Sequence, residues 1–291
     1  RQVRRQKRRG SVSRVILLSD GLANVGVTDT RDLERRTGAM YEDGVSVSTF
    51  GMGYEFDEDL LMAMAGGGGG SYHYISHSGD IVAALKREFN MAARTAASGV
   101  EIIIRPLGGS RFERVPGHRW RFEDSSAVIR LGDLSAGEER TLMANLSVPT
   151  GRIGDREVAH VSLRYTDPLS GEVHARSGSA VSLAVIDDPE RHSQGFDPLV
   201  QEKKAVIESS ALMEEAAKKV DAGDREGARS VIMRAIGALR AAPSAPAVKQ
   251  EMEMVEEYSE NLDDLDTMAP AELREMQKEQ KYRSYRQIHQ Q

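Results

Sequence analysis

Hydrophobic positions in the first third of the chain form short continuous runs that alternate with stretches of helical spacing. The runs predict three strands, over residues 14–18, 45–53 and 72–76. The helical stretches predict three helices, over residues 29–43, 57–65 and 79–98. The first run is apolar on both faces, which is typical of a central strand buried on both sides. Because strands and helices alternate, we expect a parallel sheet with right-handed crossovers.

Beyond Gly99 the pattern changes to short alternating segments that are separated by Gly, Pro, Asp and Ser. This alternation is typical of an antiparallel β-sandwich. From about residue 196 onward, apolar positions recur at helical spacing, and these stripes predict packed helices without recognisable chemistry. Three regions are therefore expected: an α/β unit over 1–98, a β-sandwich over 99–188 and a helical C-terminal region over 189–291.

Composition narrows the classes of function. The net charge of -6 gives no general attraction to nucleic acid or acidic membranes. The basic run at residues 1–9 lacks interleaved aromatic side chains, so we interpret it as a solvated helix end in preference to a nucleic-acid arm. No apolar run approaches the roughly 20 residues that span a bilayer. The chain has no cysteine, which excludes disulfides and thiolate metal sites.

Asp20 lies directly after the first apolar run, between Ser19 and Gly21. In an open parallel sheet, ligands bind beyond the carboxyl ends of the strands, where Asp20 is expected. A carboxylate there can bind Mg²⁺ or Ca²⁺, either directly or through water. It can also cap the following turn, because Asp followed by Gly commonly opens one. From the local sequence alone, the cap is favoured over metal binding.

Two segments resemble the second half of a von Willebrand factor type A (vWA) domain. They are VILLSDGLANVG, residues 15–26, and VSVSTFGMGYEFDEDLLMAMAGGGGGSYHYI, residues 45–75, which a long helix follows. The sequence is most similar to bacterial vWA proteins related to inter-alpha-trypsin inhibitor heavy chains and calcium-activated chloride channel homologues. The resemblance covers residues 1–98 and implies a partial, doubly wound vWA domain whose N-terminal part precedes Arg1.

In that family, a metal-ion-dependent adhesion site combines an Asp-x-Ser-x-Ser loop, a Thr on a middle loop and an Asp that ends the fourth strand. The resemblance assigns the last role to Asp20, with Ser19, Gly21 and Asn24 shaping its loop, and places the other ligands before residue 1. It implies Mg²⁺ or Ca²⁺, bound weakly or not at all by this fragment. It also implies a partner protein whose carboxylate completes the metal site, and it favours an extracytoplasmic or cell-envelope location.

Two other groups of residues offer weaker candidate metal sites. Asp133 and Ser135 form a partial copy of the adhesion loop, but Gly137 stands where a second Ser belongs, so a hairpin turn is favoured. His73 and His77 are four residues apart, but a strand over 72–76 would not bring them together.

The sequence contains no recognisable catalytic motif. It has no Walker-type phosphate loop, no Gly-x-Ser-x-Gly and no His-Glu-x-x-His, and the five glycines at 66–70 are expected to form turns near the ligand face. We therefore expect a non-catalytic protein-recognition module. The alternatives are a metal-assisted hydrolase that uses Asp20 and a purely structural assembly module.

Overall fold

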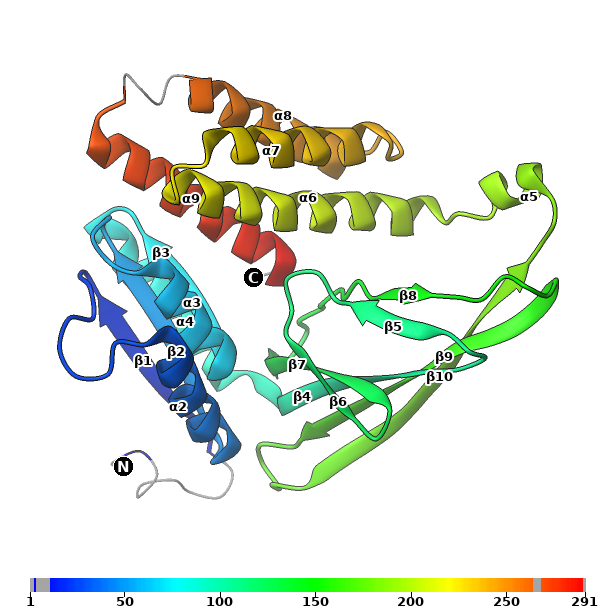
Figure 1. Ribbon diagram of the computed structural model, residues 1–291. Helices are drawn as coiled ribbons and strands as arrows, with labels where there is room; N and C mark the ends of the chain where they lie inside the picture. Colours follow the sequence, from blue (N-terminus) through cyan, green and yellow to red (C-terminus); the bar gives the residue numbers. More distant parts are fainter. Residues whose placement is uncertain (1–2, 4–10, 264–267, 290–291) are drawn as a thin grey trace.

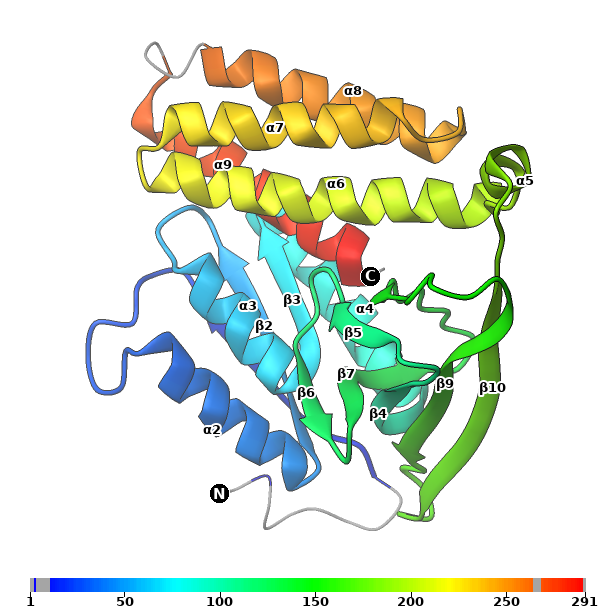
Figure 2. The same cartoon turned by 45° about the vertical axis from the view of Figure 1, so that its right-hand side comes forward.

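The computed structural model describes residues 3, 11–263 and 268–289. These form an α/β unit, an antiparallel sheet region and a layer of helices that lies across both (Figures 1 and 2). The basic run at 1–9, apart from Val3, lies outside the described residues, as does Leu265 of the third predicted helical stripe. The mixed α/β class is as the sequence predicts.

The α/β unit contains a parallel three-stranded sheet in the order β1-β2-β3. Its strands are β1 (Ser13–Ser19), β2 (Val45–Met52) and β3 (Gly69–Ile75). Its helices are α2 (Thr30–Glu42), α3 (Glu58–Gly67) and α4 (Ile81–Ala93), and the short 3-10 helix η1 (Ser78–Asp80) precedes α4. Asp29 and Asp57 cap α2 and α3 by accepting backbone N–H bonds from Asp32 and Leu60.

Strand β1 departs from the prediction of a strand buried on both sides. Ile16 packs into the cluster beneath α4, and Leu17 packs on the opposite face with α3, so the run does serve both faces of the sheet. Among the described strands, however, β1 pairs only with β2 and lies at the edge. Its residues are therefore only partly buried, and Leu18 is 42 % exposed.

Helix α4 ends earlier than the pattern of small and apolar residues over 79–98 predicts. The Thr95 hydroxyl donates to the carbonyls of Met91 and Ala92, and the Ser135 hydroxyl also donates to Met91 O. These bonds satisfy carbonyls that a continued helix would use. The chain is already extended at Thr95, where β4 (Thr95–Pro106) begins, so this strand crosses the predicted boundary at residue 98.

The second region is antiparallel, as predicted, with five strands in the order β10-β9-β4-β7-β6. Besides β4 they are β6 (Trp120–Glu123), β7 (Ser126–Ser135), β9 (Gly154–Thr166) and β10 (Val173–Val185). A separate two-stranded sheet pairs β5 (Arg111–Arg114) with β8 (Asn145–Ser147) and shares a core with the larger sheet. β10 is exposed over most of its length. The structure thus supports an antiparallel region, while its description as a β-sandwich stays a prediction.

The C-terminal region is helical, as predicted. Its helices are α5 (Pro189–Gln194), α6 (Pro198–Asp221), α7 (Arg225–Arg240), α8 (Pro246–Asp263) and α9 (Pro270–His289). Apolar faces of α6, α7 and α8 form one core that includes Met213, Ile232 and Val255. Helix α9, red in Figure 2, lies between this layer and the parallel sheet. None of the described helices is both long and apolar enough to cross a membrane.

Candidate functional site

The candidate site lies at the carboxyl ends of the parallel strands. The loop after β1 and the loop after β2 leave the sheet at this edge, because β1 and β2 pair in parallel with Ser19 opposite Gly51. Gly51 must lack a side chain, since a Cβ there would lie 2.2 Å from the Phe56 ring. Phe56 thereby folds the second loop back onto the sheet and places it near the first.

Asp20 is exposed at the start of the first loop, as expected for the end of a parallel strand. Its carboxylate has no hydrogen-bond or ion-pair partner among the described residues, so it does not cap the turn. Ser19 stabilises the turn instead, because its hydroxyl donates to Gly21 O at 2.9 Å. The loop beyond is solvated: Asn24 is exposed, as is Leu22 at 65 %.

The described residues do not by themselves form a metal site. Mg²⁺ prefers six oxygen ligands, and the loop offers one free carboxylate and the hydroxyl of Ser19. No group of three or more His, Asp or Glu side chains is placed to hold a metal ion in the part of the chain that the structure describes. Metal binding at Asp20 therefore needs further ligands.

Helix α9 reaches this edge of the sheet with two buried lysines. Lys278 Nζ donates to Phe56 O at 2.8 Å and to Glu58 at 2.5 Å, and it lies 3.9 Å from the centre of the Phe56 ring. Lys281 Nζ lies 2.6 Å from Glu58 and 2.5 Å from Asp221 at the end of α6. These contacts join three elements that are distant in sequence.

The charges in this cluster stabilise one another. Burial alone would raise the pKa of Glu58, but the hydrogen bonds from Lys278 and Lys281 lower it below its ordinary value. Burial alone would lower the pKa of Lys281, but Asp59, Asp221 and Glu58 together raise it. Both groups are therefore charged at neutral pH and act as fixed ion-pair partners.

A cavity of about 590 Å³ opens between these loops and α9. Gly21, Leu22 and Asn24 of the first loop line one side of it. The other lining residues come from the second loop with the start of α3, from the end of α6 and from α9: Tyr54, Glu55, Phe56, Glu58, Asp221, Arg274, Gln277 and Lys278. Two of the predicted loop residues, Gly21 and Asn24, thus border the cavity, whereas Asp20 and Ser19 do not line it.

The glycine run at 66–70 is not near this edge, contrary to the prediction. It joins the end of α3 to the start of β3, at the amino edge of the parallel sheet. Its glycines allow close packing instead: a Cβ on Gly70 would lie 2.4 Å from Val47 O, and Gly69 has a φ of +65°.

His73 and His77 do not converge, as predicted. His73 is buried in β3, where its Nε2 lies 2.9 Å from Glu88 Oε2, while His77 is exposed and contacts Ser76. Glu88 also binds Arg14 at 2.6 Å. These contacts give His73 a structural role.

Asp133, the weaker candidate of the partial adhesion loop, also takes part in a buried network. It lies near the end of β7, before the turn at Gly137, and accepts hydrogen bonds from Arg14 and from the Tyr41 hydroxyl. Arg14 therefore connects Asp133 to Glu88 and ties the antiparallel sheet to the α/β unit.

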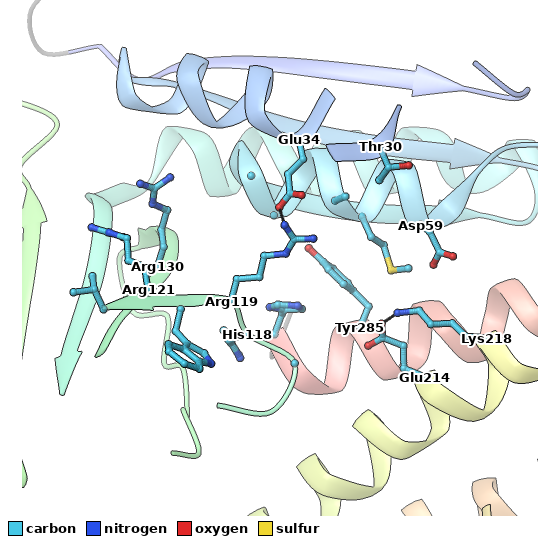
Figure 3. A pocket seen from close by; sticks show the side chains of 18 residues that line it. Thr30, Glu34, Asp59, His118, Arg119, Arg121, Arg130, Glu214, Lys218 and Tyr285 are labelled. Carbon is cyan, nitrogen blue, oxygen red and sulfur yellow. Dashed lines mark hydrogen bonds and ion pairs between the residues drawn. The ribbon is translucent and has the colours of Figure 1, made fainter. Parts of the chain in front are cut away.

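A second cavity, of about 600 Å³, lies where the three regions meet (Figure 3). Arg119 reaches across it to Glu34 on α2, and Lys218 pairs with Glu214 on α6. Arg121, on the β6 side, binds Glu101 and Glu123. Because these cations are all paired within the chain, the charges serve the junction between the regions and do not indicate a ligand.

Sequence reasoning missed the contribution of α6 and α9 to the carboxyl edge. Gln277, Lys278 and Lys281 are polar residues that face inward. Tyr282 and Tyr285 pack against the core of the α/β unit beside them, so the docking side of α9 is only partly apolar. One signal was available, because Tyr282, Tyr285 and Ile288 recur at helical spacing, which indicates a helix face that packs against another element.

Comparisons with known proteins agree with the fold. No protein-family model matches the chain. The von Willebrand factor type A structure from Catenulispora acidiphila superposes with a TM-score of 0.70 at 17 % identity, over 94 % of this chain and 65 % of that one. The fold is vWA-like. At this level of identity the likeness concerns the fold alone.

Two curated relatives are longer than this chain. The uncharacterized protein sll0103 of Synechocystis sp. is 26 % identical over 237 residues, which are 77 % of this chain and 55 % of that protein. The uncharacterized protein YfbK of Escherichia coli is 28 % identical over 146 residues, 48 % of this chain and 25 % of that protein. The chain thus spans about half of the first relative and a quarter of the second.

Proposed function

We propose that this vWA-like chain is a non-catalytic protein-recognition module whose binding face is the carboxyl edge of the parallel sheet. The observation that carries the proposal is the exposed carboxylate of Asp20, which lies at the start of a solvated loop and has no partner among the described residues. A carboxylate that stabilises nothing within the described fold is available to a ligand.

Asp20 would be one ligand of a Mg²⁺ or Ca²⁺ ion, with Ser19, Gly21 and Asn24 shaping its loop. The ion would bind the carboxylate of a partner protein. The further ligands would come from a segment that precedes β1 in the longer protein, of which this chain would supply the C-terminal half of the vWA domain.

Two charged groups at this edge, Glu58 and Lys281, are held in ion pairs. Acid–base catalysts work best with a pKa near the operating pH. Glu58 has a lowered pKa and Lys281 a raised one, so both are held in their charged forms by each other and by neighbouring groups. Glu58 and Lys281 therefore act as fixed ion-pair partners that dock α9, and they do not bear on the alternative of a hydrolase that uses Asp20.

Site-specific photo-crosslinking tests the proposal. A photoreactive residue at Leu22, 65 % exposed in the first loop, should crosslink a partner protein in the native host. The same residue at Leu169, 72 % exposed beyond β9, is the control and should not. Removal of divalent ions, or Asp20→Ala, should abolish the Leu22 product. Equal yields at both positions would contradict the proposed face, and a product insensitive to Asp20→Ala would support the purely structural alternative.

A further inference from the structure

Gln277, which lines the cavity at the carboxyl edge, has a buried hydrogen-bond donor without a partner among the described residues. Gln277 lines the cavity and is 3 % exposed. Its Oε1 accepts a hydrogen bond of 2.7 Å from the Tyr258 hydroxyl, but its Nε2 has no partner among the described residues. Leaving a buried donor unpaired is unfavourable, so a group that accepts from it would be favoured here.

Arg274 places a cation one helical turn before Gln277. Residues three apart lie on the same side of a helix, and both side chains line the cavity. The guanidinium carbon of Arg274 lies 5.6 Å from the centre of the exposed Tyr54 ring, a contact that orients its planar group. Among the described residues, Arg274 has no carboxylate partner.

The other cations of this cavity are already engaged. Lys278 is held by Glu58 and Phe56 O, and Lys281, just behind the lining, is held by Glu58 and Asp221. The donors that remain are the Arg274 guanidinium and the Gln277 amide. Both are hydrogen-bond donors, and a carboxylate offers oxygens that accept from such groups.

We propose that this cavity is a carboxylate-binding subsite that works without metal, with Arg274 at its mouth and Gln277 at its base. This inference rests on the proposed function at one point, namely that the bound carboxylate belongs to a protein. The carboxylate is an acidic side chain or a free C-terminus. Glu55, exposed on the lining, opposes a bound anion and keeps the subsite weak for a single carboxylate. A partner that presents two carboxylates would engage Asp20's metal and this subsite together.

The test uses the whole chain in EDTA and follows the side-chain amide signals of glutamine by NMR. The probes are N-acetyl-glutamate N-methylamide for an acidic side chain, N-acetyl-alanine for a C-terminus, and N-acetyl-glutamine N-methylamide as the neutral control. The Gln277 signal, assigned from Gln277→Glu, should shift with one or both acids and not with the control. Equal shifts with the neutral control would overturn the proposal, as would a shift only with N-acetyl-lysine N-methylamide, which would pair with Glu55.

Variants locate the binding. Arg274 is exposed, so Arg274→Gln does not endanger folding. This variant should lower the affinity for the acid probe about tenfold, which is the effect of losing one charge-assisted hydrogen bond. Arg31→Gln, at an exposed arginine on α2, is the matched control, and Glu55→Gln should tighten binding. Asp20→Ala should leave it unchanged. Acid binding that ignores Arg274→Gln but requires Mg²⁺ and Asp20 would refute the subsite and leave the proposed function standing. Acid binding that needs Arg274 and ignores Mg²⁺ and Asp20 is the expected result, and it leaves the metal face to be tested separately with a divalent cation.

Discussion

Replacing Lys281 by Met tests whether α9 is held to the α/β unit by its buried ion pairs. The Lys281 side chain is 2 % exposed, and its ammonium lies 2.5 Å from Asp221, 2.6 Å from Glu58 and 3.6 Å from Asp59. Removing one partner of a buried ion pair typically costs about 3–5 kcal/mol. Glu58 keeps Lys278, and the Asp221 side chain, 40 % exposed, can be hydrated, so we expect the lower end, about 3 kcal/mol.

The structure supplies a matched control in Lys218→Met. Lys218 makes an ion pair of 2.6 Å with Glu214 on α6, the same distance as Lys281 to Glu58, but its side chain is 49 % exposed. Exposed pairs contribute about 0–1 kcal/mol, so this variant should lose no more than that. The comparison therefore separates the effect of burial on stability from the effect of ion-pair distance.

Urea denaturation and hydrogen exchange measure the two losses. In Lys281→Met, exchange over α9 and the start of α3 should rise about 100-fold, which corresponds to about 3 kcal/mol of local opening. Exchange in the antiparallel sheet should change little. Equal effects of the Lys281 and Lys218 variants, or a rise spread evenly over the chain, would refute the reasoning that these buried pairs dock α9.

Two further predictions concern the interior of the α/β unit. Burial raises the pKa of Glu88, but His73 and Arg14 more than offset this and lower the pKa from 4.5 to about 2. The contribution of Glu88 to the free energy of unfolding is therefore complete above pH 4.5 and falls by about 3 kcal/mol as the pH drops through about 2. Acid unfolding should show this loss in the parent protein and not in Glu88→Gln. Gly70→Ala should lower the free energy of unfolding measured in urea by about 1–3 kcal/mol, because the new Cβ would lie 2.4 Å from Val47 O. Gly66 has open space around it, so Gly66→Ala should be neutral or stabilising. Equal effects of the two variants would contradict this packing.

The strands of the α/β unit could be predicted because their signal is local. Val45 to Phe50 are buried continuously, and the predicted strand over 45–53 ends one residue beyond β2. The helix starts were also encoded locally, in the capping side chains of Asp29 and Asp57. The end of α4 was encoded locally only in part. Thr95 is a neighbour in sequence, but Ser135, which also donates to Met91 O, is 44 residues from Met91.

The candidate site likewise has one part that could be predicted from the sequence and one part that could not. The position of Asp20 at the carboxyl edge follows from the order of strands and helices alone. The same order places the glycine run at the amino edge, since a helix-to-strand turn lies there, so that error was avoidable. The contacts of α9 were not predictable: Lys278 and Glu58 are 220 residues apart, and only the packed fold brings them together.

A measurement of where a divalent cation binds tests the central claim, which is that it binds at Asp20, most directly. Mn²⁺ shares the oxygen ligands and octahedral preference of Mg²⁺ and broadens the NMR signals of nearby amides. On titration of this chain, broadening should centre on Ser19 to Asn24 and should half-saturate no lower than the millimolar range, because one carboxylate replaces little of the hydration shell. Asp20→Ala should abolish it. Broadening centred on any other cluster of carboxylates, or broadening of the loop that survives Asp20→Ala, would contradict the assignment of this edge as the metal-linked recognition face.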